Sequence, residues 1–274
     1  MIRGRASTLS RARLRGGTDV APFDAEGRAP AVLVFHGFTG TTSEVRPLLD
    51  AIAREGLAVR APILPGHGTS PCDLQGSSFD AWAEAMDTEL TRARERSGAK
   101  VVVCGFSLGS LVAMHLAAAR PGDVVGLVAL GNALTLTAAS RVPLGLIDRL
   151  GVAIPDWYLM KPFAVDMTDR AAAARVTTYD RHPLRAALEV YRAGARVRAE
   201  VARITCPTLV VHGARDRVCG VENAAWLAAH VGATDVTVRV YPRSAHAVAA
   251  DVDRDAVARE TLAFIDRVAT TPPR

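Results

Sequence analysis

The chain has 274 residues, of which 49% are hydrophobic, and carries a formal net charge of +5 at pH 7. This length fits one large α/β domain or two small ones, and the apolar content is enough for a sizeable core. No apolar run reaches the roughly 18 residues that span a bilayer, so stable membrane insertion is excluded.

The excess positive charge lies at the start of the chain, where residues 1–15 contain five arginines and no acidic residue. The remaining 28 basic and 28 acidic residues cancel, so no basic face and no nucleic-acid partner are expected. We expect residues 1–18 to form a disordered basic tail, with weak attachment to a polyanion or membrane surface as the alternative. The tail lacks an apolar segment and is not predicted to be a secretory signal.

Apolar runs alternate with helical patterns along the rest of the chain, which is typical of a parallel sheet with helices on both faces. The expected strands cover residues 31–35, 58–62, 100–104, 124–131, 208–213 and 236–241. The expected helices cover residues 43–54, a segment capped by Ser77 or Ser78, 110–119 and 253–269. The predicted fold is a doubly wound, mostly parallel α/β sheet.

Residues 134–203 interrupt this alternation, with four prolines and no clear strand. We expect a helical cap inserted between two core strands, the core itself consisting of residues 19–133 and 204–274. Trp157 and Phe163 belong to the apolar first half of the segment. Such residues either pack the insertion onto the core or line a substrate pocket. Both roles stay open, and Trp157 and Phe163 are the candidates for substrate contact.

The sequence G-F-S-L-G at residues 105–109 follows an expected strand and precedes an expected helix, which is the context of a nucleophile elbow. A serine on so tight a turn adopts a strained backbone conformation, and side chains two positions before and after it would collide with the turn. Ser107 is therefore the candidate nucleophile, and it lies at a helix N-terminus that favours negative charge.

A serine nucleophile needs a base and a group that orients the base. Asp216 and His246 follow Ser107 in the order serine, acid, histidine, each just after an expected strand. We expect Asp216 to bind one ring nitrogen of His246 and the other nitrogen to take the Ser107 proton. His36 and His212 end strands beside glycine and are expected to shape the site, whereas His182 is expected to be a surface or insertion residue.

An oxyanion hole needs two donors. The backbone N–H of Leu108 is one candidate, and Phe38, in the loop H-G-F-T-G at residues 36–40, is the other. His36 and Gly37 of this loop are expected to approach the substrate.

Four cysteines occur without a C-x-x-C pair or a zinc-binding spacing, at Cys72, Cys104, Cys206 and Cys219. Free thiols and no metal are the simplest expectation, which favours a reducing, cytoplasmic location.

These motifs together resemble the α/β-hydrolase superfamily, and within it the bacterial carboxylesterases and monoacylglycerol lipases with a small cap. The likeness covers roughly residues 20–269 and is carried by H-G-F-T-G (36–40), P-G-H-G (65–68), G-F-S-L-G (105–109), P-T-L-V-V-H-G (207–213) with Asp216, and Ala245-His246. It implies hydrolysis of short- to medium-chain acyl esters through an acyl-serine, without a cofactor or metal, and a cap over the acyl pocket.

Other activities of the same fold stay open: thioester cleavage, acyl transfer and hydrolysis of a C–C bond. The serine at position 107 argues against dehalogenase and epoxide-hydrolase chemistry, where relatives use aspartate. A non-catalytic binding protein on this fold would typically lack one of the three residues Ser107, Asp216 and His246, and all three are present.

Overall fold

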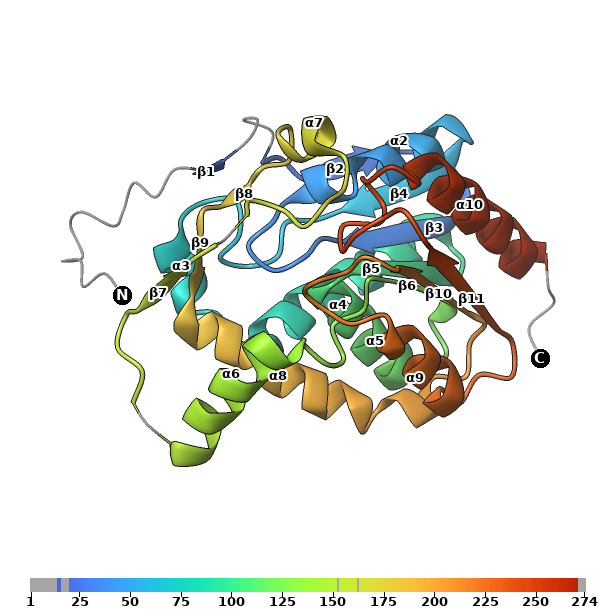
Figure 1. The fold of residues 1–274 in the computed structure, drawn as a ribbon. Coiled ribbons are helices and arrows are strands. Elements are labelled where there is room, and N and C mark those ends of the chain that lie inside the picture. Colours follow the sequence, from blue (N-terminus) through green and yellow to red (C-terminus); the bar gives the residue numbers. More distant parts are fainter. Residues whose placement is uncertain (1–13, 16–19, 152, 162, 271–274) are drawn as a thin grey trace.

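The computed structural model describes residues 14–15, 20–151, 153–161 and 163–270, within which the main sheet has seven strands (Figure 1). Six strands run parallel in the order β11-β10-β6-β5-β3-β4, and β2 pairs antiparallel with β4 at the edge. Their bounds are β2 Phe23–Ala25, β3 Arg28–Phe35, β4 Leu57–Ala61, β5 Val101–Phe106, β6 Val124–Leu130, β10 Thr208–Gly213 and β11 Val236–Tyr241. The predicted doubly wound, mostly parallel sheet is confirmed.

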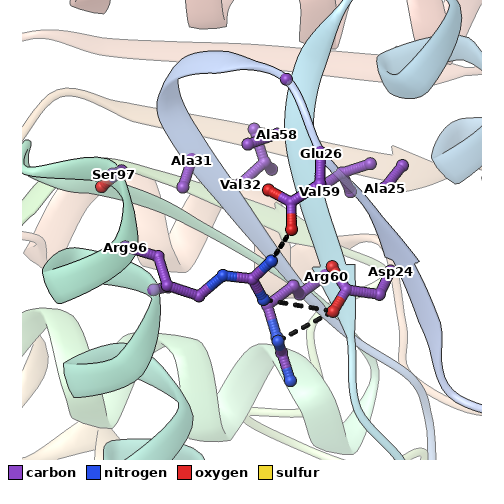
Figure 2. A pocket seen from close by; sticks show the side chains of 12 residues that line it. Asp24, Ala25, Glu26, Ala31, Val32, Ala58, Val59, Arg60, Arg96 and Ser97 are labelled. Carbon is purple, nitrogen blue, oxygen red and sulfur yellow. Dashed lines mark hydrogen bonds and ion pairs between the residues drawn. The ribbon is translucent and has the colours of Figure 1, made fainter.

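An ion-pair cluster lies at the β2–β4 edge of the sheet (Figure 2). Asp24 accepts hydrogen bonds from Arg60 at 2.8 Å and Arg96 at 3.3 Å, and Arg96 also pairs with Glu26. The hollow between them has a volume of about 50 Å³, which is space for one or two water molecules. These charges satisfy one another and discourage pairing of the edge with another sheet.

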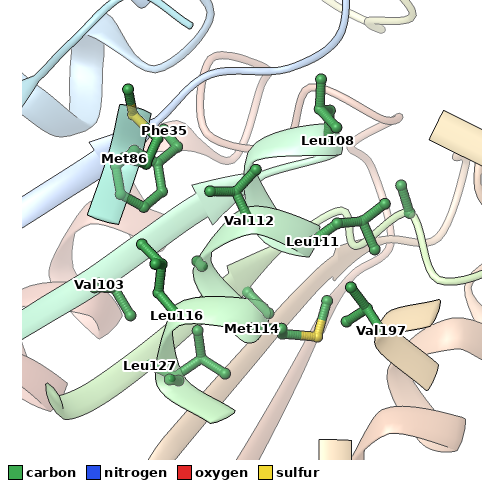
Figure 3. Packing of buried hydrophobic residues seen from close by; sticks show 14 of the residues in the cluster. Phe35, Met86, Val103, Leu108, Leu111, Val112, Met114, Leu116, Leu127 and Val197 are labelled. Carbon is green, nitrogen blue, oxygen red and sulfur yellow. The ribbon is translucent and has the colours of Figure 1, made fainter. Parts of the chain in front are cut away.

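Both faces of the sheet are buried, because successive side chains of a strand point to opposite faces. Leu33 and Phe35 of β3 belong to one buried cluster, and Val32 and Val34 belong to the other. The first cluster includes α4 (Phe79–Ser97), α5 (Leu108–Ala119), α8 (Leu184–Arg198) and α9 (Glu222–His230), and the second includes α2 (Arg46–Arg54) and α10 (Arg254–Thr270). Figure 3 shows the packing around α5, the helix that follows the candidate nucleophile.

Helix ends follow the local sequence where capping signals exist. Ser78 caps α4 by accepting the N–H of Ala81 at 3.2 Å. Gly98 ends the helix in the left-handed conformation, with φ +63°, which glycine adopts readily because it has no Cβ. The helix expected over residues 43–54 is confirmed from Arg46 onward, but its expected start at Ser43 is wrong. A short 3₁₀ helix, η1 (Thr42–Glu44), comes first, and α2 begins at Arg46 because Pro47 fits only the first turn of a helix.

The segment 134–203 contains strands that the sequence did not predict. α6 (Ala138–Leu150), α7 (Arg170–Ala173) and α8 are helical, but β7 (Tyr158–Met160) pairs antiparallel with β9 (Arg181–Pro183), and β8 (Thr178–Tyr179) pairs with β1 (Leu14–Arg15). Strands of two or three residues are too short to show the apolar–polar alternation by which a strand is recognised in a sequence. Four apolar residues of this segment have exposed side chains: Leu146, Leu150, Leu159 and Met160.

The expected basic tail, residues 1–18, lies outside the described residues except for Leu14 and Arg15 of β1 and is not tested. Two further short elements, α3 (Pro71–Gln75) and η2 (Val201–Arg203), complete the described part of the chain and were not predicted either. No described helix has the length and apolar character that crossing a membrane requires.

Candidate active site

Ser107 lies on the sharp turn between β5 and α5 and has φ +54° and ψ −116°, a conformation that L residues rarely adopt. The flanking glycines make the turn possible. A Cβ on Gly105 would lie 2.1 Å from the carbonyl oxygen of Gly109, and a Cβ on Gly109 would lie 2.3 Å from that of Phe35. The strained elbow predicted from G-x-S-x-G is therefore present, with Ser107 at the first turn of α5.

Three loops at the carboxyl ends of strands bring the predicted serine, histidine and aspartate together. The Nε2 atom of His246 lies 2.9 Å from Oγ of Ser107, and its Nδ1 atom lies 2.7 Å from Oδ2 of Asp216. A carboxylate only accepts, so Nδ1 of His246 carries the proton and Nε2 is free to accept from the serine hydroxyl. Ser107 and His246 are each 7% exposed, which leaves the serine buried but reachable.

Asp216 is held by a set of donors that the sequence did not reveal. Its Oδ1 accepts the N–H groups of Val218 and Cys219, each at 2.8 Å, and Nε2 of His212 lies 3.0 Å from Oδ2. Burial alone raises the pKa of Asp216, but the charge of His246 and the hydrogen bonds from both histidines hold it well below its usual range. The carboxylate is therefore ionised and its orientation is fixed. His212 shapes the site through this contact.

Burial disfavours a charged imidazole and lowers the pKa of His246, but nearby carboxylates outweigh that effect. The charge and hydrogen bond of Asp216, with the charges of Asp166 and Glu44, raise the pKa of His246 above its ordinary value. A proton taken from Ser107 is thus stabilised on the ring. At acidic pH the same carboxylates keep the ring protonated and unable to act as a base.

The two expected oxyanion donors belong to two segments: Leu108 to the elbow and Phe38 to the β3–η1 loop. Leu108 begins α5, so its N–H has no acceptor within the helix. Phe38 belongs to the β3–η1 loop, in which Gly40 donates to the carbonyl of Gly37 at 3.2 Å. Among the described residues, neither the Phe38 nor the Leu108 N–H has a backbone or side-chain acceptor.

The β3–η1 loop is supported by the segment 134–203. Thr39 has φ +66°, a strained conformation for a β-branched residue. Its carbonyl accepts the N–H of Tyr179 at 2.9 Å and the Oγ1 hydroxyl of Thr178 at 3.0 Å, both from β8. A segment far along the chain therefore determines the backbone conformation next to Phe38.

The ring of Phe38 is packed among aromatic groups, one of which sequence reasoning overlooked. His182 of β9 stacks on Phe38 with ring centroids 5.5 Å apart and an angle of 7°, and Trp82 and His67 approach at 6.5 and 6.2 Å. Burial, with a smaller effect from Lys161, lowers the pKa of His182 to about 3, so the ring is neutral. No local sequence signal marks His182, because only the fold brings β9 to the loop.

Of the four residues expected to contact the substrate, His36 and Gly37 lie in the β3–η1 loop. The ring of His36 is buried and neutral, with Nδ1 donating to the carbonyl of Gly37 at 2.9 Å and Nε2 accepting from the N–H of Leu64 at 3.1 Å. Burial lowers its pKa to about 4. Gly37 gives its N–H to Glu44 at 2.9 Å. The ring of His36 therefore supports the loop, because both of its nitrogens have protein partners.

Trp157 and Phe163 lie apart from each other. Trp157 packs against the cluster of Leu144, Leu184 and Leu188 between α6 and α8. Phe163 lies under the guanidinium of Arg217, 4.5 Å from ring centroid to Cζ, next to Asp216 in the chain. Their role as substrate contacts stays a prediction. Phe163 is nearer to the residues that hold His246.

No group of three or more His, Cys, Asp or Glu side chains among the described residues is placed to hold a metal ion. Cys104, Cys206 and Cys219 are buried free thiols, and Cys72 is an exposed one. Burial raises the pKa of the Cys104 thiol, so this side chain behaves as an apolar core residue.

A doubly wound sheet with a serine elbow after its central strand β5 defines the α/β-hydrolase class of enzymes. The chain belongs to the family described as "Serine aminopeptidase, S33", whose model matches residues 27–253.

The chain is 28% identical over 243 residues to the thermostable monoacylglycerol lipase of Bacillus sp. (strain H-257), a match covering 89% of this chain and 93% of the relative. It is 24% identical over 247 residues to the carboxylesterase of Bacillus subtilis (strain 168), covering 90% and 96%. A solved structure reported for LipS and LipT, two metagenome-derived lipolytic enzymes, superposes with a TM-score of 0.83 at 24% identity, covering 90% and 98%, which shows the shared fold. The protein is a hydrolase of this family.

Proposed function

We propose that the protein cleaves short- to medium-chain carboxylic esters, monoacylglycerols included, through an acyl-serine formed on Ser107. The observation that carries the proposal is the continuous hydrogen-bond chain from Ser107 through His246 to Asp216 on a nucleophile elbow. The named activities of the relatives favour an ester as substrate, although the family takes its description from an aminopeptidase.

The proposed reaction has two halves. Oγ of Ser107 attacks the acyl carbon while Nε2 of His246 takes the hydroxyl proton, and the N–H groups of Phe38 and Leu108 donate to the resulting oxyanion. The C–O bond then breaks, and the alcohol leaves with the proton from His246. A water molecule then attacks the acyl carbon while Nε2 of His246 takes its proton. The bond from the acyl carbon to Oγ breaks, the proton passes from His246 to Oγ of Ser107, and the carboxylic acid leaves. Asp216 stays ionised and stabilises the imidazolium in both halves.

We assign residues 134–203 as a cap, with 19–133 and 204–274 as the core. Two contacts support this division: β8 binds the Thr39 carbonyl of the β3–η1 loop, and α8 packs against α5 behind the elbow. A segment that contacts the β3–η1 loop of Phe38 and the helix α5, which begins at Leu108, is well placed to limit the size of the acyl group.

Hydrolysis of p-nitrophenyl esters from acetate to dodecanoate tests the proposed substrate class. We expect turnover with a maximum at short to medium chain length, because a cap closes one end of the acyl site. A folded protein that a fluorophosphonate labels but that cleaves no ester of the series would contradict ester hydrolysis. Acyl thioesters would then be the next substrates to measure.

The pH dependence of kcat/KM tests the role of His246. Its raised pKa means that the ring is protonated at low pH and becomes a base only as pH rises through that pKa. We therefore expect activity to rise with pH, with the acidic limb centred above the value of about 6.5 that is ordinary for histidine. A profile that is flat from acidic to neutral pH would rule out a histidine base.

A further inference from the structure

Glu44 is a buried carboxylic acid that the proposed reaction does not use directly. It ends η1, is 5% exposed, and its Oε2 accepts the N–H of Gly37 at 2.9 Å. The loop from Gly37 to Gly40 wraps around this carboxyl group. A Cβ on Gly40 would lie 2.0 Å from Oε2, and one on Gly37 would lie 3.0 Å from it. The loop has glycine at these positions because Glu44 occupies the space beneath them.

Phe38 therefore lies between two fixed peptide groups. On one side Glu44 holds the N–H of Gly37, and on the other β8 holds the carbonyl of Thr39 through Thr178 and Tyr179. Between them lies the Gly37–Phe38 peptide, which bears the Phe38 N–H, the proposed oxyanion donor. Its carbonyl accepts from Nδ1 of His36 at 2.9 Å and from the N–H of Gly40 at 3.2 Å, so Glu44 and β8 hold the peptide groups that flank the donor. A misdirected donor is costly, because it acts only if it already points at the developing charge.

The charged and titratable groups around Glu44 come from three parts of the chain. Lys161 and His246 face it with positive or protonatable groups, while the nearby ring of His36 is buried with a pKa lowered to about 4 and is neutral. Burial raises the pKa of Glu44 to about 7, although Lys161, the Gly37 hydrogen bond and His246 act in the opposite direction. The carboxyl group therefore gains or loses its charge near neutral pH. When charged, it stabilises a protonated His246.

We propose that Glu44 is a positioning residue that acts on both halves of the proposed machinery, holding the β3–η1 loop so that Phe38 donates to the oxyanion and supporting the imidazolium of His246 with its negative charge. This inference rests on the proposed function of Ser107, His246 and Phe38. Neither the H-G-F-T-G motif nor the serine–histidine–aspartate pattern includes this acid.

Two substitutions separate the charge of Glu44 from its shape. Glu44→Gln keeps the size of the side chain and an oxygen that accepts the Gly37 N–H, but it removes the charge and the titration. We expect it to fold normally, to move the acidic limb of kcat/KM to lower pH, and to lower the plateau of kcat by roughly tenfold, as loss of one charge near a developing cation would do.

Glu44→Ala removes the hydrogen bond and leaves the loop without its support. We expect it to lower kcat by about 10²-fold with a much smaller change in KM, because an oxyanion donor acts mainly in the transition state. Circular dichroism and thermal melting establish whether this variant is folded. If Glu44→Ala does not fold, the conservative variant Glu44→Gln still tests the proposal.

Glu89→Gln is the matched control, because Glu89 is also a buried carboxylate but pairs with Arg60 and Arg92 at the sheet edge. We expect its pH profile to equal that of the unmodified protein. An acidic limb that does not move in Glu44→Gln overturns the proposal, and so does a folded Glu44→Ala variant with unchanged kcat.

The pH dependence of fluorophosphonate labelling at Ser107 gives a second readout that needs no ester substrate. We expect Glu44→Gln to move this labelling profile to lower pH as well, because labelling requires the same histidine base. A protein that labels but cleaves no ester would contradict the proposed function while still testing Glu44. Labelling profiles that coincide for the unmodified protein and Glu44→Gln would again overturn the role of Glu44.

Discussion

The Ser107→Ala variant is expected to lose ester hydrolysis by about 10⁶-fold in kcat, the scale of removing the nucleophile from a serine–histidine–aspartate site. The expected cause is chemical, because the substitution deletes the Oγ atom that His246 activates at 2.9 Å. Alanine keeps the Cβ of serine, so the backbone at φ +54° meets no new atom. The fold should therefore be retained, and thermal melting should show little change.

Ser110→Ala is a suitable comparison for this variant. Ser110 is also buried on the elbow, where its hydroxyl donates to the carbonyl of Ser107 at 2.6 Å. Its loss removes this hydrogen bond and the one it accepts from the N–H of Ala133 at 3.4 Å, each with a net effect of about 1 kcal/mol on stability, but leaves the Ser107 hydroxyl in place. We expect fluorophosphonate labelling to persist in Ser110→Ala and to disappear in Ser107→Ala. Turnover retained by Ser107→Ala would show that another nucleophile acts.

The elements with strong local patterns were predicted well from the sequence. Residues 208–213 and 236–241 form β10 and β11 with the expected bounds. The first contains a buried apolar run, and the second alternates valine with threonine and arginine, as a strand at the edge of a sheet does. The elbow was equally clear, because so tight a turn requires glycine two positions before and two positions after Ser107, and the sequence has glycine at both. Edge strand β2 and helix α9 were missed. β2 has three residues, and the alanine-rich α9 has only a weak apolar face.

Contacts between distant parts of the chain explain what the sequence could not show about the site. The order of Ser107, Asp216 and His246, each just after an expected strand, predicted that they interact. The structure places their side chains within hydrogen-bond distance. His182 and Glu44 have no motif around them. Their places beside and beneath the β3–η1 loop depend on β9 and on the two glycines that admit a buried carboxyl group.

The substitution Asp216→Asn is expected to lower kcat by about 10⁴-fold with little loss of folding. The hydrogen bonds around Asp216 determine how asparagine would sit. The N–H groups of Val218 and Cys219 both point at Oδ1, so the amide oxygen takes that place and the amide nitrogen faces His246. An N–H group directed at Nδ1 of His246 selects the opposite tautomer, with the proton on Nε2. That nitrogen can then no longer accept from Ser107.

Measurement of kcat and KM for Asp216→Asn, with Asp253→Asn as the control, tests this account. Asp253 accepts from Arg243 and Ser244 next to the histidine loop but does not bind His246, so its substitution should change kcat by far less. Near-normal activity in Asp216→Asn would mean that another carboxylate orients the ring. Asp166 would then be tested, since its charge also raises the pKa of His246. A large loss in kcat at nearly constant KM would instead show that Asp216 acts through the tautomer and charge of His246 rather than through substrate binding.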